Sequence, residues 1–461
     1  MPSKKPLKKW WGVNPNIFRA YDIRGLYPEE LNAKTAYLIG RALVKFLNKP
    51  KADIVVGRDN RLSSPTLFKN LVQGIIDEGA DVIDIGLSTS PMLYWAVADY
   101  KFDGGVEITS SHNPPQWNGF KLVKEKAVFI SEKTGLKKIK KIVQEMSGAE
   151  EKKNKAPKGK IQKKKVLNNY LKFILKDFKK EKISDLKIVI DTGNAVPGIL
   201  IPEISQKVPF KIYHLFSKLD SNFPNRSLYP LEKGSLKALQ KEVKLRKADL
   251  GVAFDGDGDR IIFVDEKSRI IASDLILALM AKIILEKNPG QKILYTICSS
   301  NIIKEVIKEK GGLPIINRVG HAFIKERMKK EGIFFAGEFS GHYYSKTHYF
   351  NEAPFFVLFK VLEEISKTKK TLSQVLKPYQ KYFHSGEIIF KVVSPKKILK
   401  KIEKKYKKGK ISHLDGLRVD FKDWWFNIRP SQTEPILKLV VEGKTKKIME
   451  EKIKELSSLV T

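Results

Sequence analysis

Short apolar runs alternate along this chain with longer segments of helix-like character. A first group of runs lies at residues 54–56, 82–85 and 106–108, a second at 188–190, 212–215 and 250–254, and a third at 293–297, 314–316 and 333–336. Continuously apolar strands that alternate with helices are typical of parallel sheets covered on both faces. The pattern therefore predicts three tandem, related α/β domains with mainly parallel sheets.

The C-terminal part of the chain has a different pattern. It predicts strands at residues 387–393, 417–421, 426–428 and 436–442, and helices at 396–408 and 446–459. This combination indicates a smaller α+β domain. A polar linker, Glu150–Gly159, marks the end of the first domain most clearly. We therefore predict four domains, at residues 1–155, 156–265, 266–375 and 376–461.

A polar loop follows the third apolar run of each α/β domain. These loops are Thr109–Pro114, Asp255–Arg260 and Gly337–His342. Ligands in open α/β sheets bind beyond the carboxyl ends of the strands. The three loops are therefore expected to face one central cleft.

The second loop contains three carboxylates, Asp255, Asp257 and Asp259, separated by single glycines. Carboxylates this close repel one another and need a cation or cationic side chains. Mg²⁺ prefers oxygen ligands, and the glycines allow the backbone to curl so that the carboxylates converge. An EF-hand calcium loop is excluded, because its sixth position requires glycine and is Arg260 here. The sequence thus predicts a magnesium site.

The remaining loops carry groups that suit a sugar phosphate. The first places hydroxyls beside His112, and a phosphorylated serine that faces Mg²⁺ would indicate phosphoryl-transfer chemistry. In the third, Glu338 and Ser340 can hydrogen-bond sugar hydroxyls. Arg429–Pro435 combines a guanidinium group with hydroxyls, which suits a phosphate dianion.

In this order the motifs resemble those of the α-D-phosphohexomutase superfamily, and most closely its phosphomannomutase/phosphoglucomutase branch. The resemblance runs from Phe18 to about Gly443. It includes further motifs at residues 18–25, 57–64, 118–121, 191–194, 320–321 and 414–420. It implies interconversion of hexose 1-phosphate and hexose 6-phosphate, of mannose, glucose or both, through a phosphoserine enzyme and a hexose 1,6-bisphosphate. The phosphorylated residue would be Ser111 rather than Ser110.

The resemblance also implies a role for each candidate residue. Mg²⁺ would be held by Asp255, Asp257, Asp259 and a phosphoserine oxygen of Ser111. The catalytic candidates are Arg24 and Arg260 on the transferring group, Lys121 and His112 in proton handling, and His321 as base or acid on the sugar side. The substrate-binding candidates are Tyr21 in the cleft, Glu338 and Ser340 on the O3 and O4 hydroxyls, and Arg429, Ser431, Gln432 and Thr433 at the distal phosphate. His342 is interpreted as a structural hydrogen-bonding group.

Several positions depart from the family's pattern. They are Gln432 for Asn, Phe339 for Met, Ala195 for Gly, Ile297 for a Lys that often contacts the ligand, and a single acid, Glu352, in the segment Asn351–Pro354. These changes concern substrate affinity and range rather than phosphoryl transfer. Two alternatives stay open: the phosphoglucosamine mutase branch and a non-catalytic sugar-phosphate-binding relative.

Composition adds few constraints. The net charge of +36 comes mostly from lysines, clustered at 137–165 and 396–410 without interleaved aromatic residues. A lysine-biased proteome and solvated helix faces explain it better than nucleic-acid binding; steering of anionic substrates is a third explanation. No apolar stretch reaches membrane-spanning length. The single cysteine, Cys298, excludes an intrachain disulfide and agrees with a cytoplasmic protein. We expect a monomer or dimer.

Overall fold

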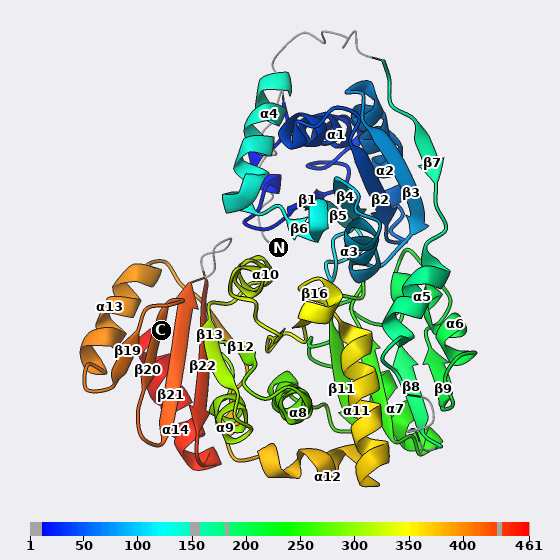
Figure 1. The fold of residues 1–461 in the computed structure, drawn as a ribbon. Helices are drawn as coiled ribbons and strands as arrows, with labels where there is room; N and C mark the ends of the chain where they lie inside the picture. Colours follow the sequence, from blue (N-terminus) through cyan, green and yellow to red (C-terminus); the bar gives the residue numbers. More distant parts are fainter. Residues whose placement is uncertain (1–11, 148–156, 180–182, 184, 431–435, 461) are drawn as a thin grey trace.

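The computed structural model describes residues 12–147, 157–179, 183, 185–430 and 436–460. These residues form four β-sheets with helices packed on them. Figure 1 shows the first sheet at the top, the second at the lower right, the third near the centre and the fourth at the lower left. The predicted fold class, three α/β units followed by a smaller α+β unit, is confirmed.

The first sheet has the strand order β1-β5-β4-β2-β3-β7, and β6 also pairs with β5. The three predicted strands, β2, β3 and β4, form its parallel centre, whereas β5 runs antiparallel to its neighbours. Because β7 pairs with β3, this sheet continues past the predicted boundary at residue 155. Its elements are β1 (Ile23–Leu26), α1 (Ala33–Leu47), β2 (Asp53–Arg58), α2 (Ser64–Asp77), β3 (Asp81–Leu87), α3 (Ser90–Asp99), β4 (Gly104–Ile108), β5 (Trp117–Lys124), β6 (Val128–Phe129), α4 (Lys137–Ser147) and β7 (Ile161–Lys163).

The second sheet has the order β11-β10-β8-β9. Strands β8, β9 and β10 are parallel, and β11 pairs antiparallel with β10. The elements of this part are α5 (Leu167–Leu175), β8 (Lys187–Asp191), α6 (Ile201–Ser205), β9 (Lys211–Leu215), α7 (Lys237–Arg246), β10 (Leu250–Phe254) and β11 (Ile261–Asp265). The antiparallel pair β10–β11 encloses the predicted metal loop.

The third sheet has the order β13-β12-β14-β15-β16. Its first three strands are parallel, and β15 and β16 are added antiparallel. The elements are α8 (Ser273–Lys287), β12 (Lys292–Thr296), α9 (Asn301–Glu309), β13 (Leu313–Asn317), α10 (His321–Glu331), β14 (Phe335–Gly337), β15 (Tyr343–Ser345), β16 (Asn351–Glu352), α11 (Pro354–Thr368) and α12 (Leu372–Leu376). The pair β14–β15 encloses the predicted sugar loop.

The fourth sheet is antiparallel, with the order β17-β22-β21-β20-β19 and β18 also paired with β22. Its elements are β17 (Phe383–His384), β18 (Ile388–Lys391), α13 (Pro395–Lys405), β19 (Lys410–Ser412), β20 (Leu417–Asp420), β21 (Trp424–Pro430), β22 (Ile436–Gly443) and α14 (Lys446–Val460). The predicted phosphate segment begins at the end of β21.

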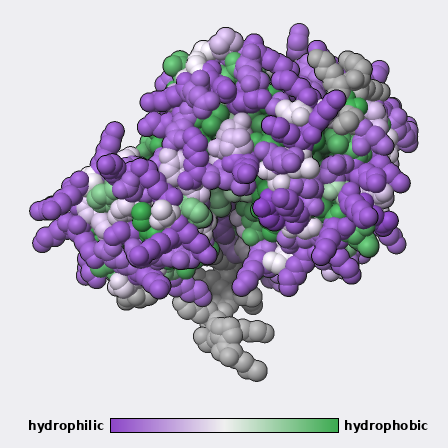
Figure 2. Space-filling model, turned by 90° about the horizontal axis from the view of Figure 1, so that it is seen from below, coloured by the Kyte–Doolittle hydropathy of each residue, from purple (hydrophilic) through white to green (hydrophobic). Residues whose placement is uncertain are grey.

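Burial explains the sequence pattern and the charge. Strands β10 and β11 are buried at every position, so they carry no polar alternation. By contrast, the lysine-rich helix α13 buries only Ile402, and Figure 2 shows hydrophilic residues over most of one face of the molecule. These features agree with solvated lysine faces. Within the described residues, no helix has the length and apolarity needed to cross a bilayer.

Candidate active site

The loop after β4 holds Ser111 in an unusual backbone conformation. Its φ is 48°, a left-handed value that a non-glycine residue adopts only where the surroundings fix it. The Ser111 amide donates to the hydroxyl of Thr109 at 2.9 Å. Ser111 is 1% exposed, and its hydroxyl donates a hydrogen bond to Asp255 Oδ2 at 2.9 Å. The first two predicted loops therefore meet at this serine.

Arg61 fixes the Ser111 loop through hydrogen bonds to its backbone, and the sequence analysis assigned this arginine no role. Its side chain is fully buried and forms an ion pair with Asp59 at 3.0 Å. The rest of its guanidinium group donates to four backbone carbonyls of the loop, those of Ser111, Asn113, Pro114 and Trp117, at 2.7 to 3.0 Å. A buried charge is retained only when it is paired and hydrogen-bonded. The available signal was the arginine followed by two serines, Arg61, Ser63 and Ser64, in the segment directly after β2.

The second loop brings its three carboxylates together. One ligand oxygen from each of Asp255, Asp257 and Asp259 lies within 4.8 Å of the others, and all three residues are buried. A Cβ atom at Gly256 would lie 2.3 Å from the Ser111 carbonyl oxygen, so only glycine allows the two loops to approach this closely. Gly258 has a φ of +71°. The structure thus gives a reason for each glycine: Gly256 allows the close approach of the two loops, and Gly258 adopts a positive φ.

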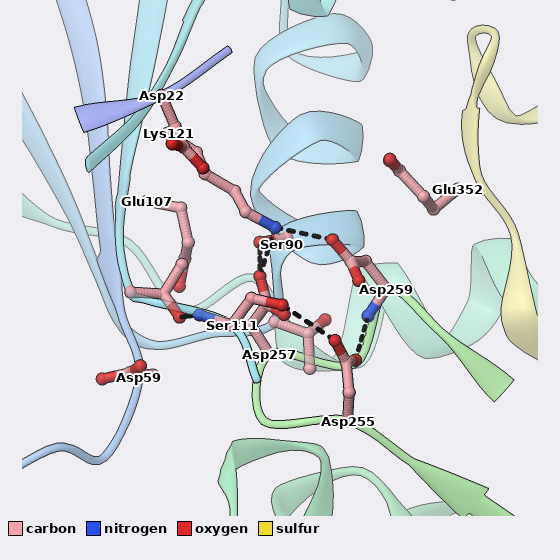
Figure 3. A network of polar contacts seen from close by, with 12 residues as sticks. Asp22, Asp59, Ser90, Glu107, Ser111, Lys121, Asp255, Asp257, Asp259 and Glu352 are labelled. Carbon is pink, nitrogen blue, oxygen red and sulfur yellow. Dashed lines mark hydrogen bonds and ion pairs between the residues drawn. The ribbon is translucent and has the colours of Figure 1, made fainter. Parts of the chain in front are cut away.

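Cationic and hydroxyl groups surround this cluster in Figure 3. The Lys121 ammonium, from β5, lies 2.5 Å from Asp257 Oδ2 and 2.6 Å from Asp259 Oδ2. Ser90, at the start of α3, donates to Asp257 Oδ2 at 2.5 Å. Ser90 is a second residue that the sequence analysis missed, and its signal was the helix-start pattern Thr89-Ser90-Pro91.

The charges of the cluster depend strongly on one another. Burial raises the pKa of Asp255 well above its ordinary value, and repulsion from Asp259 and Asp257 adds to this. Burial alone would lower the pKa of Lys121, but Asp257 and Asp259 raise it well above its usual range. The lysine is therefore the counterion of the carboxylates in this arrangement. The side-chain oxygen Asp257 Oδ1 is buried and accepts no hydrogen bond from a described residue. Buried, converging carboxylate oxygens with spare acceptor capacity fit a hard divalent cation.

Three further candidates lie at the same place. His112 Nδ1 is 3.3 Å from the Ser111 hydroxyl, and burial, with Arg260 and Arg24, lowers the His112 pKa well below its usual value. These effects favour the neutral imidazole. Arg24 donates to Asn113 Oδ1 at 2.6 Å, and Arg260 Nε lies 3.6 Å from Asp255 Oδ2. The structure thus brings both predicted guanidinium groups to the Ser111 loop and the Asp triplet.

The third loop joins the site through His342. Its Nε2 lies 3.2 Å from Asp259 Oδ1, and its Nδ1 lies 2.8 Å from the Ser340 hydroxyl. Glu338 is 4% exposed and accepts a hydrogen bond from Tyr344 at 2.5 Å. The hydrogen bonds of His342 with Ser340 and Arg260 agree with its interpretation as a structural hydrogen-bonding group, and they connect the sugar loop directly to the metal loop. The motif could not reveal this contact, because it depends on how two sheets are placed.

His321 begins α10 and packs between aromatic rings from the first domain. Its ring centroid lies 4.7 Å from that of Phe129 and 5.2 Å from that of Tyr21. Burial lowers the His321 pKa well below its usual value, and Lys325 and Lys121 lower it further. Burial raises the pKa of Tyr21 to about 12. His321 is therefore neutral, and Tyr21 keeps its proton.

The phosphate segment is described only in part. Arg429 is paired with Glu387 at 2.6 Å, whereas Ser431, Gln432 and Thr433 lie outside the described residues. Ile297 is fully buried in a small apolar cluster with Cys298, Trp425 and Val440. Ile297, where the family resemblance led us to expect a lysine, thus forms an apolar contact between the third and fourth domains.

Four family domains match consecutive parts of the chain. They are described as the α/β/α domains I, II and III and the C-terminal domain of phosphoglucomutase/phosphomannomutase, and they match residues 15–150, 168–268, 272–382 and 387–457. A phosphomannomutase of Methanocaldococcus jannaschii is 37% identical over 96% of this chain and 97% of its own. A phosphomannomutase/phosphoglucomutase of Pseudomonas aeruginosa is 35% identical over 94% and 93%.

Among solved structures, a phosphoglucomutase/phosphomannomutase family protein from Burkholderia thailandensis superposes with a TM-score of 0.88. The sequences are 28% identical, and the match covers 97% of each chain. The same four-domain arrangement therefore extends over nearly the whole length.

Proposed function

Because the chain belongs to the phosphoglucomutase/phosphomannomutase family and is a hexose phosphate mutase, we propose that Ser111 carries the phosphoryl group that it transfers. One observation carries this assignment: the Ser111 hydroxyl lies 2.9 Å from Asp255, inside a buried cluster of three carboxylates. The neighbouring hydroxyl, Ser110 Oγ, is also buried but has no hydrogen-bond partner among the described residues.

The proposed reaction consists of two phosphoryl transfers, and each is accompanied by a proton transfer. Phospho-Ser111 donates its phosphoryl group to a hexose monophosphate, which gives a hexose 1,6-bisphosphate. The sugar turns over in the cleft and returns its other phosphate to Ser111. Neutral His112, or Lys121, handles the proton at the transferring group, and His321 does so on the sugar side. Arg24 and Arg260 are placed to stabilise the charge on the transferring phosphoryl group.

We propose that the cation is Mg²⁺, held by Asp255, Asp257, Asp259 and a phosphoserine oxygen. Carboxylate oxygens alone favour a hard cation over a softer metal. When bound, Mg²⁺ would neutralise charge on the transferring phosphoryl group. The ion would share Asp257 and Asp259 with Lys121, which lies 2.5 and 2.6 Å from them, and would add to the charge compensation that the lysine provides.

Substrate binding is proposed to involve Glu338, Ser340 and Tyr21 at the sugar and Arg429 with Ser431, Gln432 and Thr433 at the distal phosphate. Glucose and mannose differ only at C2, whereas Glu338 and Ser340 would bind O3 and O4. Selectivity requires a contact that differs between the competitors. We therefore expect kcat/KM values for glucose 1-phosphate and mannose 1-phosphate within about tenfold, or ~1.4 kcal/mol.

A coupled assay on purified protein tests this expectation, with glucosamine 1-phosphate as the third substrate. Glu338→Ala should impair glucose and mannose about equally, and added glucose 1,6-bisphosphate should shorten any lag. The matched control is Glu326→Ala, because Glu326 belongs to the third domain but not to the sugar loop. A thousandfold preference for one sugar would refute dual specificity. Preferential turnover of glucosamine 1-phosphate would favour the phosphoglucosamine mutase branch.

A further inference from the structure

A buried ion pair lies behind the sugar side of the site. Lys325 Nζ, on α10, is 2.7 Å from Glu352 Oε2, on β16, and the two side chains are only 6% and 1% exposed. The Lys325 ammonium also lies 4.3 Å from the ring centroid of Tyr94 and 4.9 Å from that of Phe129. The ion pair comes from the third domain and both rings from the first, so the lysine joins the two domains. Figure 1 shows α10 and β16 of the third domain facing β6 and α3 of the first.

One ring connects this lysine to His321. The two residues are four positions apart on α10, so they share one face of the helix. Phe129 contacts both: its centroid is 4.7 Å from the His321 ring and 4.9 Å from the Lys325 ammonium. The place of Phe129, and with it the tilt of His321, therefore depends on the contact between Lys325 and the first domain.

The acidic partner connects to the sugar loop. Glu352 is the cross-strand neighbour of Tyr344 in the β15–β16 pair. The Tyr344 hydroxyl donates to Glu338 Oε1 at 2.5 Å. A displacement of Glu352 would therefore move the residue that orients Glu338. In Figure 3, Glu352 lies across from the Asp triplet, beyond Asp259.

We propose that Lys325 and Glu352 are positioning residues, which hold His321 and Glu338 in register with the Ser111 half of the site. Among the described residues, neither forms a hydrogen bond or ion pair with Ser111 or the Asp triplet, so both act through other side chains. This inference rests on the proposed function, in which His321 and Glu338 work on the sugar while Ser111 provides the phosphoryl group. Two half-sites from different domains need such a connection, because a misplacement of about 1 Å can cost about 100-fold in rate.

The test compares Lys325→Met, Glu352→Gln and the double variant. Each single variant leaves one buried group without its partner and should unfold at a lower urea concentration, whereas the double variant should regain stability. We expect kcat to fall about 10- to 100-fold in all three variants, equally on glucose and mannose phosphates. Substrate KM should change by less than about threefold, because the distal phosphate contacts are untouched. Lys325→Arg, which keeps the cation over both rings, should recover most of the turnover.

The matched control is a second lysine–glutamate pair of the same domain, Lys282 and Glu364, which lie 2.6 Å apart between α8 and α11. Lys282→Met should lower stability and leave kcat unchanged. A double Lys325→Met/Glu352→Gln variant with wild-type kcat would overturn the proposal and leave the pair a purely structural role. The two hypotheses fail separately. A wild-type protein without phosphate on Ser111 contradicts the proposed function, whereas normal Ser111 phosphorylation with undiminished turnover in the variants contradicts only the positioning role.

Discussion

Replacing Ser111 with alanine is expected to lower kcat by on the order of 10³-fold or more, because Ser111 is the proposed carrier of the phosphoryl group between the two sugar positions. The hydroxyl lies within reach of both Asp255 and His112. The substitution removes only one oxygen atom, and alanine tolerates the positive φ of residue 111 no worse than serine does. The fold should therefore persist, and the loss should appear in turnover rather than in stability.

Peptide mapping of the active protein should find phosphate on Ser111. Ser110→Ala is the matched control, since it removes the adjacent buried hydroxyl, which has no hydrogen-bond partner among the described residues. That variant should keep its phosphate and most of its activity. Phosphate on Ser110 alone, together with an inactive Ser110→Ala variant, would show that the assignment is displaced by one residue.

Sequence patterns predicted the parallel strands of the fold better than the antiparallel ones. Each α/β unit was recognised from three strands, and these strands form the parallel part of each sheet. The antiparallel strand β5 did not stand out, because the polar residues Asn118 and Lys121 interrupt its apolar positions, and Lys121 contacts Asp257 and Asp259. Strand β15 is only three residues long. A strand that contributes to an active site loses the apolar run by which a buried strand is recognised.

The residues of the candidate site also fall into two groups, those that a local motif predicts and those whose contacts depend on packing between domains. Motifs predicted the Ser111 loop and the Asp triplet, because charge repulsion and glycine geometry are local properties of the sequence. The contacts of His342, Arg61 and Lys325 depend on how separate sheets pack, and no local spacing encodes that. Arg61 contacts carbonyl groups some fifty residues away, which makes its role invisible until both segments are placed.

Asp257→Asn is expected to lower kcat by at least ~100-fold, a loss typical of removing one electrostatic contributor. Chelator should abolish the turnover of the wild-type protein, and Mg²⁺ should restore it. Binding can be measured without turnover, because a ligand that binds only the folded state raises the free energy of unfolding by about 2.7 kcal/mol at a hundredfold excess over Kd. We therefore expect Mg²⁺ to raise the unfolding temperature of the wild type but not that of Asp257→Asn.

The physical reason lies in the balance of charge around the cluster. Lys121 lies 2.5 and 2.6 Å from Asp257 and Asp259, and burial together with the two neighbouring carboxylates raises the pKa of Asp255. A divalent cation would compensate all three carboxylates, whereas an amide at position 257 would reduce the negative charge available to hold the cation. Asp84→Asn is the matched control, because Asp84 is also buried but pairs with Arg58 on β2. Full activity in chelator would contradict a metal site built on this triplet, and so would equal Mg²⁺ stabilisation of wild type and Asp257→Asn. Either result would leave Lys121 as the permanent cation of the cluster.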